Sequence, residues 1–155
     1  MRLIVEAGPH AGVPRASVAR AARAMLEAIE LSDHELSVVL TGDEQIKNLN
    51  RIYRKKNKAT DVLAFSQREG KLGDRAGPLL GDVVVSVPTA RRQADTLSRD
   101  VLSEVLWLVA HGLLHLVGWD HDTAPKDRRM RRETARLCAY ARRDSVRVRR
   151  KEITK

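Results

Sequence analysis

The sequence predicts an α/β fold: one compact domain in which helices pack on a sheet of about four strands. Short aliphatic segments with the pattern of strands alternate along the chain with longer segments of helical periodicity. The 155 residues are 43% hydrophobic and 32% charged, as in an ordinary globular domain that buries a core of its own. No internal repeat or low-complexity stretch in the sequence marks a second domain.

The first half of the chain predicts two strands and two helices. Residues 2–6 form a short strand, and Pro14 suits the start of a helix because apolar residues recur at helical spacing after it. Residues 36–40 predict a second strand. Asp43 is then expected to cap a second helix, which leads into a basic loop at residues 54–58.

The second half predicts two further strands, at residues 62–65 and 81–87, with a surface loop between them at residues 67–77. Pro88 opens a helix. Ser98 is expected to cap the next one, which runs to about Val117 and is apolar nearly all round, the pattern of a buried helix. A last helix is predicted at roughly residues 126–142.

Positive charge is concentrated at the C-terminal end. The net charge of +9 arises from 29 basic and 20 acidic residues. Residues 1–125 carry 16 of each, whereas residues 126–155 carry 13 basic and 4 acidic residues. Such a segment attracts polyanions, since each neutralised phosphate releases condensed counterions. We therefore expect nucleic acid, not a membrane, as the partner, with residues 1–145 forming the domain and residues 146–155 a flexible basic tail.

The cysteine content and the apolar runs indicate a soluble, cytoplasmic protein. Cys138 is the single cysteine, so an intrachain disulfide is excluded and a reducing compartment is compatible with the sequence. The apolar run at the N-terminus is too short for the core of a signal peptide. The longest apolar stretch, residues 105–119, is interrupted by two histidines and is too short to span a bilayer.

Three of the five histidines lie close together in the sequence, at His111, His115 and His121. The i, i+4 spacing of the first two puts both imidazoles on one helical face, where they can reach a single ion. Gly118 can adopt the left-handed conformation that ends a helix, so that the chain turns back and delivers His121. Three nitrogen ligands with an open fourth position are typical of catalytic zinc, and we expect one zinc ion per chain.

Nearby residues leave alternatives open. Cys138 could supply a fourth ligand, although its apolar neighbours favour core packing. Asp120 could orient a histidine ligand or cap the turn after the helix. Gly112 stands where metalloproteases with this histidine spacing carry a glutamate general base, so peptide hydrolysis is disfavoured.

These residues resemble the YbeY family of bacterial endoribonucleases that mature ribosomal RNA. Residues 111–121 match the family pattern H-G-x-L-H-L-x-G-[YFW]-D-H at every fixed position. Residues 49–63 resemble its L-N-x-x-Y-R and T-[DN]-V-L blocks, and residues 80–86 resemble its L-G-D-I-x-I-S strand. The family often has Pro, Ser and Pro at the positions of Ala59, Ala64 and Ser66, which are departures outside the histidine block.

The resemblance implies a metal-dependent endoribonuclease specific for single strands, acting on ribosomal RNA and ribosomal particles in RNA maturation and ribosome quality control. It implies a mixed sheet beside the metal helix, His111, His115 and His121 as zinc ligands, and Arg54 with His111 as the catalytic residues. Two alternatives stay open: a zinc-stabilised, non-catalytic RNA-binding factor in ribosome assembly, and a metallohydrolase of another substrate class. The sequence assigns no general base and no oligomeric state.

Overall fold

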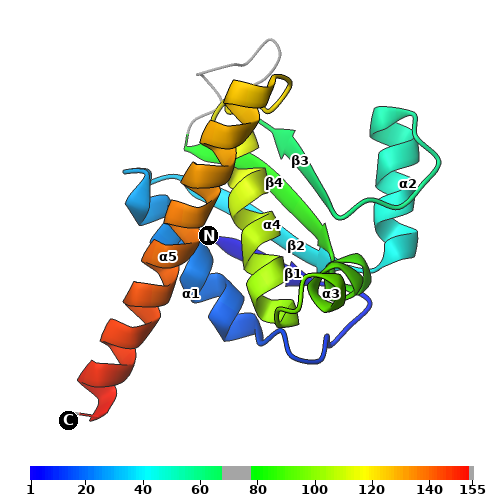
Figure 1. The fold of residues 1–155 in the computed structure, drawn as a ribbon. Helices are drawn as coiled ribbons and strands as arrows, with labels where there is room; N and C mark the ends of the chain where they lie inside the picture. Colours follow the sequence, from blue (N-terminus) through cyan, green and yellow to red (C-terminus); the bar gives the residue numbers. More distant parts are fainter. Residues whose placement is uncertain (68–77, 154–155) are drawn as a thin grey trace.

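The computed structural model describes residues 1–67 and 78–153 (Figure 1). In chain order, the elements of the described residues are β1 (Arg2–Val5), α1 (Arg15–Ala28), β2 (Glu35–Thr41), α2 (Asp43–Arg54), β3 (Val62–Ser66), β4 (Leu79–Ser86), α3 (Val87–Thr96), α4 (Val101–Leu116) and α5 (Ala124–Ile153). The surface loop predicted at residues 67–77 lies, apart from its first residue, outside the described part.

The four strands form the mixed sheet that was predicted. Their order is β1-β2-β4-β3. β1, β2 and β4 run parallel, and β3 pairs antiparallel with β4 at the edge of the sheet. β4 has a strand on each side and is apolar on both faces, as expected for a central strand.

Helices cover both faces of this sheet (Figure 1). α1 and α4 pack on one face, and α5 packs on α1 and α4. Together these helices enclose the main hydrophobic core, to which Val83 and Val85 of β4 contribute. Val84 points to the opposite face, because successive strand residues alternate sides. There it joins Ile46 of α2 and Leu63 of β3 in a smaller cluster.

The starts of two helices differ from the prediction. α2 begins at Asp43, with Gly42 as its N-cap, so Asp43 is not the cap. Its carboxylate instead accepts hydrogen bonds from the hydroxyls of Ser86 and Thr89, both at 2.6 Å, and so ties α2 to the start of α3. The two partners lie 43 and 46 residues further along the chain, so the local pattern of the helix start could not reveal them.

The predicted cap of α4 is also wrong. Asp100 takes this position, and its Oδ1 accepts a hydrogen bond of 2.8 Å from the backbone N–H of Ser103. Ser98 lies two residues earlier in a left-handed conformation with φ 54°, in the turn after α3. An aspartate is as good a cap as a serine, so local preference did not separate the two positions. The predicted burial of α4 on most of its sides is confirmed.

α5 is longer than predicted. It continues past Arg142 to Ile153, so the described residues of the expected tail form the last turns of a 30-residue helix. No glycine or proline interrupts it after Pro125, and ion pairs one turn apart, such as Asp127–Arg131, support it. Neither α5 nor any other helix in the described part of the chain is long and apolar enough to cross a membrane.

α4 lies unusually close to the sheet at Gly112. A Cβ atom added there would lie 2.6 Å from Cγ1 of Val83 and 3.4 Å from Cγ2 of Val62. The first distance is far below van der Waals contact. The glycine of the histidine block is therefore required by packing, in addition to lacking a catalytic carboxylate.

We predict that Gly112→Ala lowers the free energy of unfolding. Overpacking a core destabilises a protein by about 1–3 kcal/mol. The higher helix propensity of alanine offsets only about 1 kcal/mol of this loss. Urea unfolding of the single variant, of Val83→Ala and of the double variant measures the coupling. Because Val83→Ala removes the two methyl groups that the new Cβ meets, the Gly112→Ala penalty should vanish in that background. An equal penalty in both backgrounds would show that this contact is not the cause.

Candidate metal centre and its cleft

The three histidines predicted as ligands lie together in the structure. His111 and His115 are one turn apart on α4, and His121 approaches them from the segment between α4 and α5. Their ring centroids are 5.1, 5.3 and 5.3 Å apart, nearly an equilateral triangle. One potential ligand atom from each ring lies within 4.8 Å of the others.

Gly118 brings His121 back to the helix, as expected. It has φ +101°, and a Cβ there would meet nothing within 4 Å, so its requirement is conformational. The N–H of Gly118 donates to the carbonyl of His115 at 3.1 Å, and the N–H of Trp119 donates to that of Leu114 at 3.0 Å. These two hydrogen bonds are a Schellman motif, which ends the helix and reverses the chain.

The spacing of the rings fits a metal ion. Zinc held by imidazole nitrogens at about 2.0–2.1 Å in tetrahedral directions would set ring centroids roughly 5 Å apart, and the observed spacing agrees. No rearrangement of α4 is needed to bring the three nitrogens around one ion. His111, His115 and His121 could therefore hold a metal through three protein ligands.

Burial prepares the imidazoles for this role. The pKa of His111 is lowered to about 4, mainly by burial and to a smaller extent by charge repulsion from His115 and His121. Desolvation, followed by His121, likewise lowers the pKa of His115. A metal binds the neutral form of imidazole. Because both pKa values are lowered, these two rings are neutral at pH 7 and can bind a metal without first releasing a proton.

Arg54 lies in the same cleft as the histidines. The cleft has a volume of about 650 Å³, and its lining includes Arg54 from the end of α2 and all three histidines. The guanidinium donates a hydrogen bond of 2.7 Å to the carbonyl of Ala64, and its central carbon lies 5.2 Å from the centroid of the Phe65 ring. Hydrogen bonding and cation–π attraction thus hold the guanidinium over β3, with other N–H groups left for a ligand.

Asp61 is a residue of the cleft that the sequence analysis did not single out. Its Oδ1 accepts a hydrogen bond of 2.8 Å from the N–H of Val62, and its Oδ2 accepts one of 3.1 Å from the amide of Gln93. The hydroxyl of Thr60 also lies 3.4 Å from Oδ1. The residue lies in the T-D-V-L block that resembles the YbeY family, and this resemblance was the signal that could have identified it.

The two remaining candidates are not among the residues that line the histidine cleft, although the charge of Asp120 tends to raise the pKa of His115. Asp120 is exposed and forms an ion pair of 3.6 Å with Lys126, and no hydrogen bond joins it to a histidine ring among the described residues. Cys138 packs at the edge of the main core, where burial raises the pKa of its thiol to about 11. It is not part of the group of metal-binding side chains, as the preference for core packing predicted.

Fold and site together define an α/β domain with a three-histidine group, able to hold a metal ion, in a cleft shared with an arginine and an aspartate. The family model described as "Endoribonuclease YbeY" matches residues 11–141. The chain belongs to the YbeY family. The resemblance found in the sequence is thus confirmed.

Relatives named Endoribonuclease YbeY extend the comparison. The protein from Geobacter metallireducens is 36% identical over 87% of this chain and 90% of its own length. The protein from Anaeromyxobacter sp. is 47% identical over 75% of this chain, which spans 59% of that protein's length. The protein from Myxococcus xanthus is 49% identical over 70% of this chain, which spans 37% of that protein's length. A solution structure from Thermotoga maritima shares the fold, with TM-score 0.61 and 22% identity over 90% of this chain and 88% of that one.

We predict that the protein binds one metal ion per chain and that His115→Ala abolishes this binding, because two imidazoles alone leave the ion weakly held. Metal content after dialysis against zinc measures the effect. His34→Ala is the matched control, because His34 is hydrogen-bonded to Asp33 and is not part of the three-histidine group. Retention of one equivalent of zinc by His115→Ala would contradict the assignment of this site.

Proposed function

We propose that this chain is a zinc-dependent endoribonuclease that cuts single-stranded RNA, and that its active site is the cleft described above. The observation that carries the proposal is the meeting of His111, His115, His121, Arg54 and Asp61 in one cleft. Membership of a family described as endoribonucleases supports the reaction class. We further propose ribosomal RNA and ribosomal particles in the cytoplasm as the setting.

The histidines would hold the metal, His111 among them as both ligand and catalytic residue. Zinc, when bound, supplies a Lewis acid for a phosphoryl oxygen and lowers the pKa of water to about 7. A cleft that presents three nitrogens from one side leaves a further position for solvent or substrate, as in other catalytic zinc sites.

Arg54 is suited to bind the phosphate that is cut. A guanidinium can donate two parallel hydrogen bonds to phosphate oxygens and so stabilise charge that develops in the transition state. Its contacts with Ala64 and Phe65 restrict its motion before the substrate arrives. Less conformational entropy is then lost when the phosphate binds.

Asp61 is suited to accept a proton. A carboxylate offers about four acceptor positions, and three donors already approach Asp61: the N–H of Val62, the amide of Gln93 and the hydroxyl of Thr60. These contacts orient the side chain and leave about one acceptor position unused. We therefore propose Asp61 as the group that takes the proton from the attacking hydroxyl or water.

The two alternatives predict different responses to metal removal. An endoribonuclease should stop cutting RNA when chelated while its circular dichroism spectrum persists, since the core is built mainly from packed aliphatic residues. A zinc-stabilised binding factor should unfold on chelation and cut no RNA beforehand. A metallohydrolase of another substrate class should leave RNA intact both with its metal bound and after chelation.

We predict that Arg54→Lys lowers the turnover of a single-stranded RNA at least ten-fold, equivalent to about 1.4 kcal/mol of transition-state stabilisation. Lysine keeps the charge but lacks the planar fork that matches two phosphate oxygens. Zinc content and melting temperature, measured in parallel, should barely change. Cleavage at the wild-type rate would mean that Arg54 acts only as a generic positive charge.

We predict that Asp61→Asn lowers turnover about 100-fold, the usual order for losing a general base, while zinc remains bound. Gln93→Ala is the control, because it removes a hydrogen-bond donor to Asp61 but keeps the carboxylate. It should reduce turnover much less. Equal losses in the two variants would assign Asp61 a purely structural role.

A further inference from the structure

α5 carries a row of arginines on its outer face that the proposed active site does not use. We define the α5 arginine stripe as Arg128, Arg132, Arg143 and Arg150, all of them exposed. At 3.6 residues per turn these positions fall within about 60° of one another. Met130 and Leu137 lie on the opposite side of the helix and are buried in the core.

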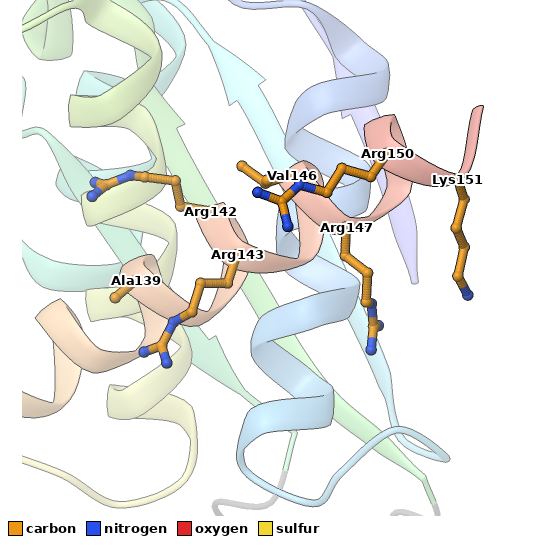
Figure 2. A pocket seen from close by; sticks show the side chains of 7 residues that line it. All are labelled: Ala139, Arg142, Arg143, Val146, Arg147, Arg150 and Lys151. Atoms are coloured by element: carbon orange, nitrogen blue, oxygen red, sulfur yellow. The ribbon is translucent and has the colours of Figure 1, made fainter. Parts of the chain in front are cut away.

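A shallow hollow lies on the C-terminal part of α5, and its lining includes two stripe residues, Arg143 and Arg150. Arg142, Arg143, Arg147, Arg150 and Lys151 line it, and Figure 2 shows their side chains spread around Ala139 and Val146. Small and aliphatic residues at the floor let a ligand approach the helix closely. The cations at the rim would then surround the ligand.

The described ion pairs of α5 do not involve three of the stripe residues, Arg128, Arg132 and Arg143. Asp127, Glu133 and Asp144 each pair with an arginine outside it, namely Arg131, Arg136 and Arg147. Within residues 1–67 and 78–153, by contrast, Arg128, Arg132 and Arg143 form no ion pair. Their charges are available to a partner without breaking an existing contact.

We propose that the α5 arginine stripe is a second RNA-binding surface, which binds the phosphate backbone of a duplex region beside the single strand held in the cleft. This inference rests on the proposed function and adds to it the kind of RNA structure, a duplex region, that α5 would bind. α5 begins three residues after His121 and extends roughly 45 Å, past α1 and α4 in Figure 1. The stripe itself, from Arg128 to Arg150, extends roughly 33 Å along this helix. A row of charges of that length matches a rigid polyanion such as a helical stem.

Two properties of the stripe favour RNA over an anionic membrane. Helices that lie on membranes present a broad apolar face with aromatic or leucine side chains, whereas Val146 is the only large hydrophobic residue exposed on α5 among its described side chains. The apolar face of α5 is already buried against α1 and α4. All four stripe positions are arginine, whose fork binds phosphate oxygens in pairs.

The test measures binding of a blunt RNA duplex, which a single-strand-specific nuclease does not cut, by the zinc-loaded protein over a range of salt concentrations. Arg132→Gln with Arg143→Gln removes two stripe charges at exposed positions and preserves helix propensity. The slope of log K against log salt should fall in magnitude by about 1.8, since each duplex phosphate contact contributes about 0.9.

The matched control is Arg2→Gln with Lys47→Gln, which removes two exposed charges from β1 and α2. It should leave the slope unchanged. An unchanged slope in the stripe variant, or an equal fall in both variants, would overturn the proposal. So would a stripe variant that loses binding to phosphatidylserine vesicles while its duplex binding is intact.

Cleavage of a short unstructured oligonucleotide separates this inference from the proposed function. The stripe variant should cut it at the wild-type rate, because such a substrate need only occupy the cleft. If the wild-type protein does not cut it at all, the proposed function fails, while the salt slope still decides whether the stripe binds RNA. If the stripe variant loses this cleavage, the stripe belongs to the active site and the proposal of a separate surface is wrong.

Discussion

The close contact of α4 with the sheet at Gly112 is the constraint on which the site depends. Because a Cβ would lie 2.6 Å from Val83, only glycine lets the helix approach β4 this closely. Gly112 lies between the two histidines of α4. The contact that sets the distance from the helix to the sheet therefore also sets the distance of both rings from β3 and β4. A helix displaced outward by a methyl group would carry His111 and His115 away from Arg54 and Asp61.

The sequence was sufficient for the parts of the site that are local in the chain. His111 and His115 share a helical face by spacing alone, and Gly118 determines how His121 returns, so the triangle of rings follows from eleven consecutive residues. The number of strands was equally accessible, because the four aliphatic segments are short and separated by helical ones. Within the described chain, all three predicted ligands lie where the local pattern put them.

Features that depend on long-range contacts were not accessible in the same way. Asp61 is held by Gln93, 32 residues away, in addition to its neighbours Thr60 and Val62. Arg54 is positioned by the backbone of β3. Asp43 could have capped its own helix, but the hydroxyls of Ser86 and Thr89 bind it instead. The length of α5 was underestimated because its arginines suggested a solvated tail, whereas ion pairs one turn apart support a helix there.

In the proposed function, RNA cleavage depends on one ion held by three histidines. The most direct test is a titration of the metal-free protein with zinc while the rate of single-stranded RNA cleavage is recorded. The rate should rise linearly from near zero and stop rising at one equivalent per chain. A rate that is already maximal without zinc, or that never rises at any zinc concentration, would contradict the proposed function.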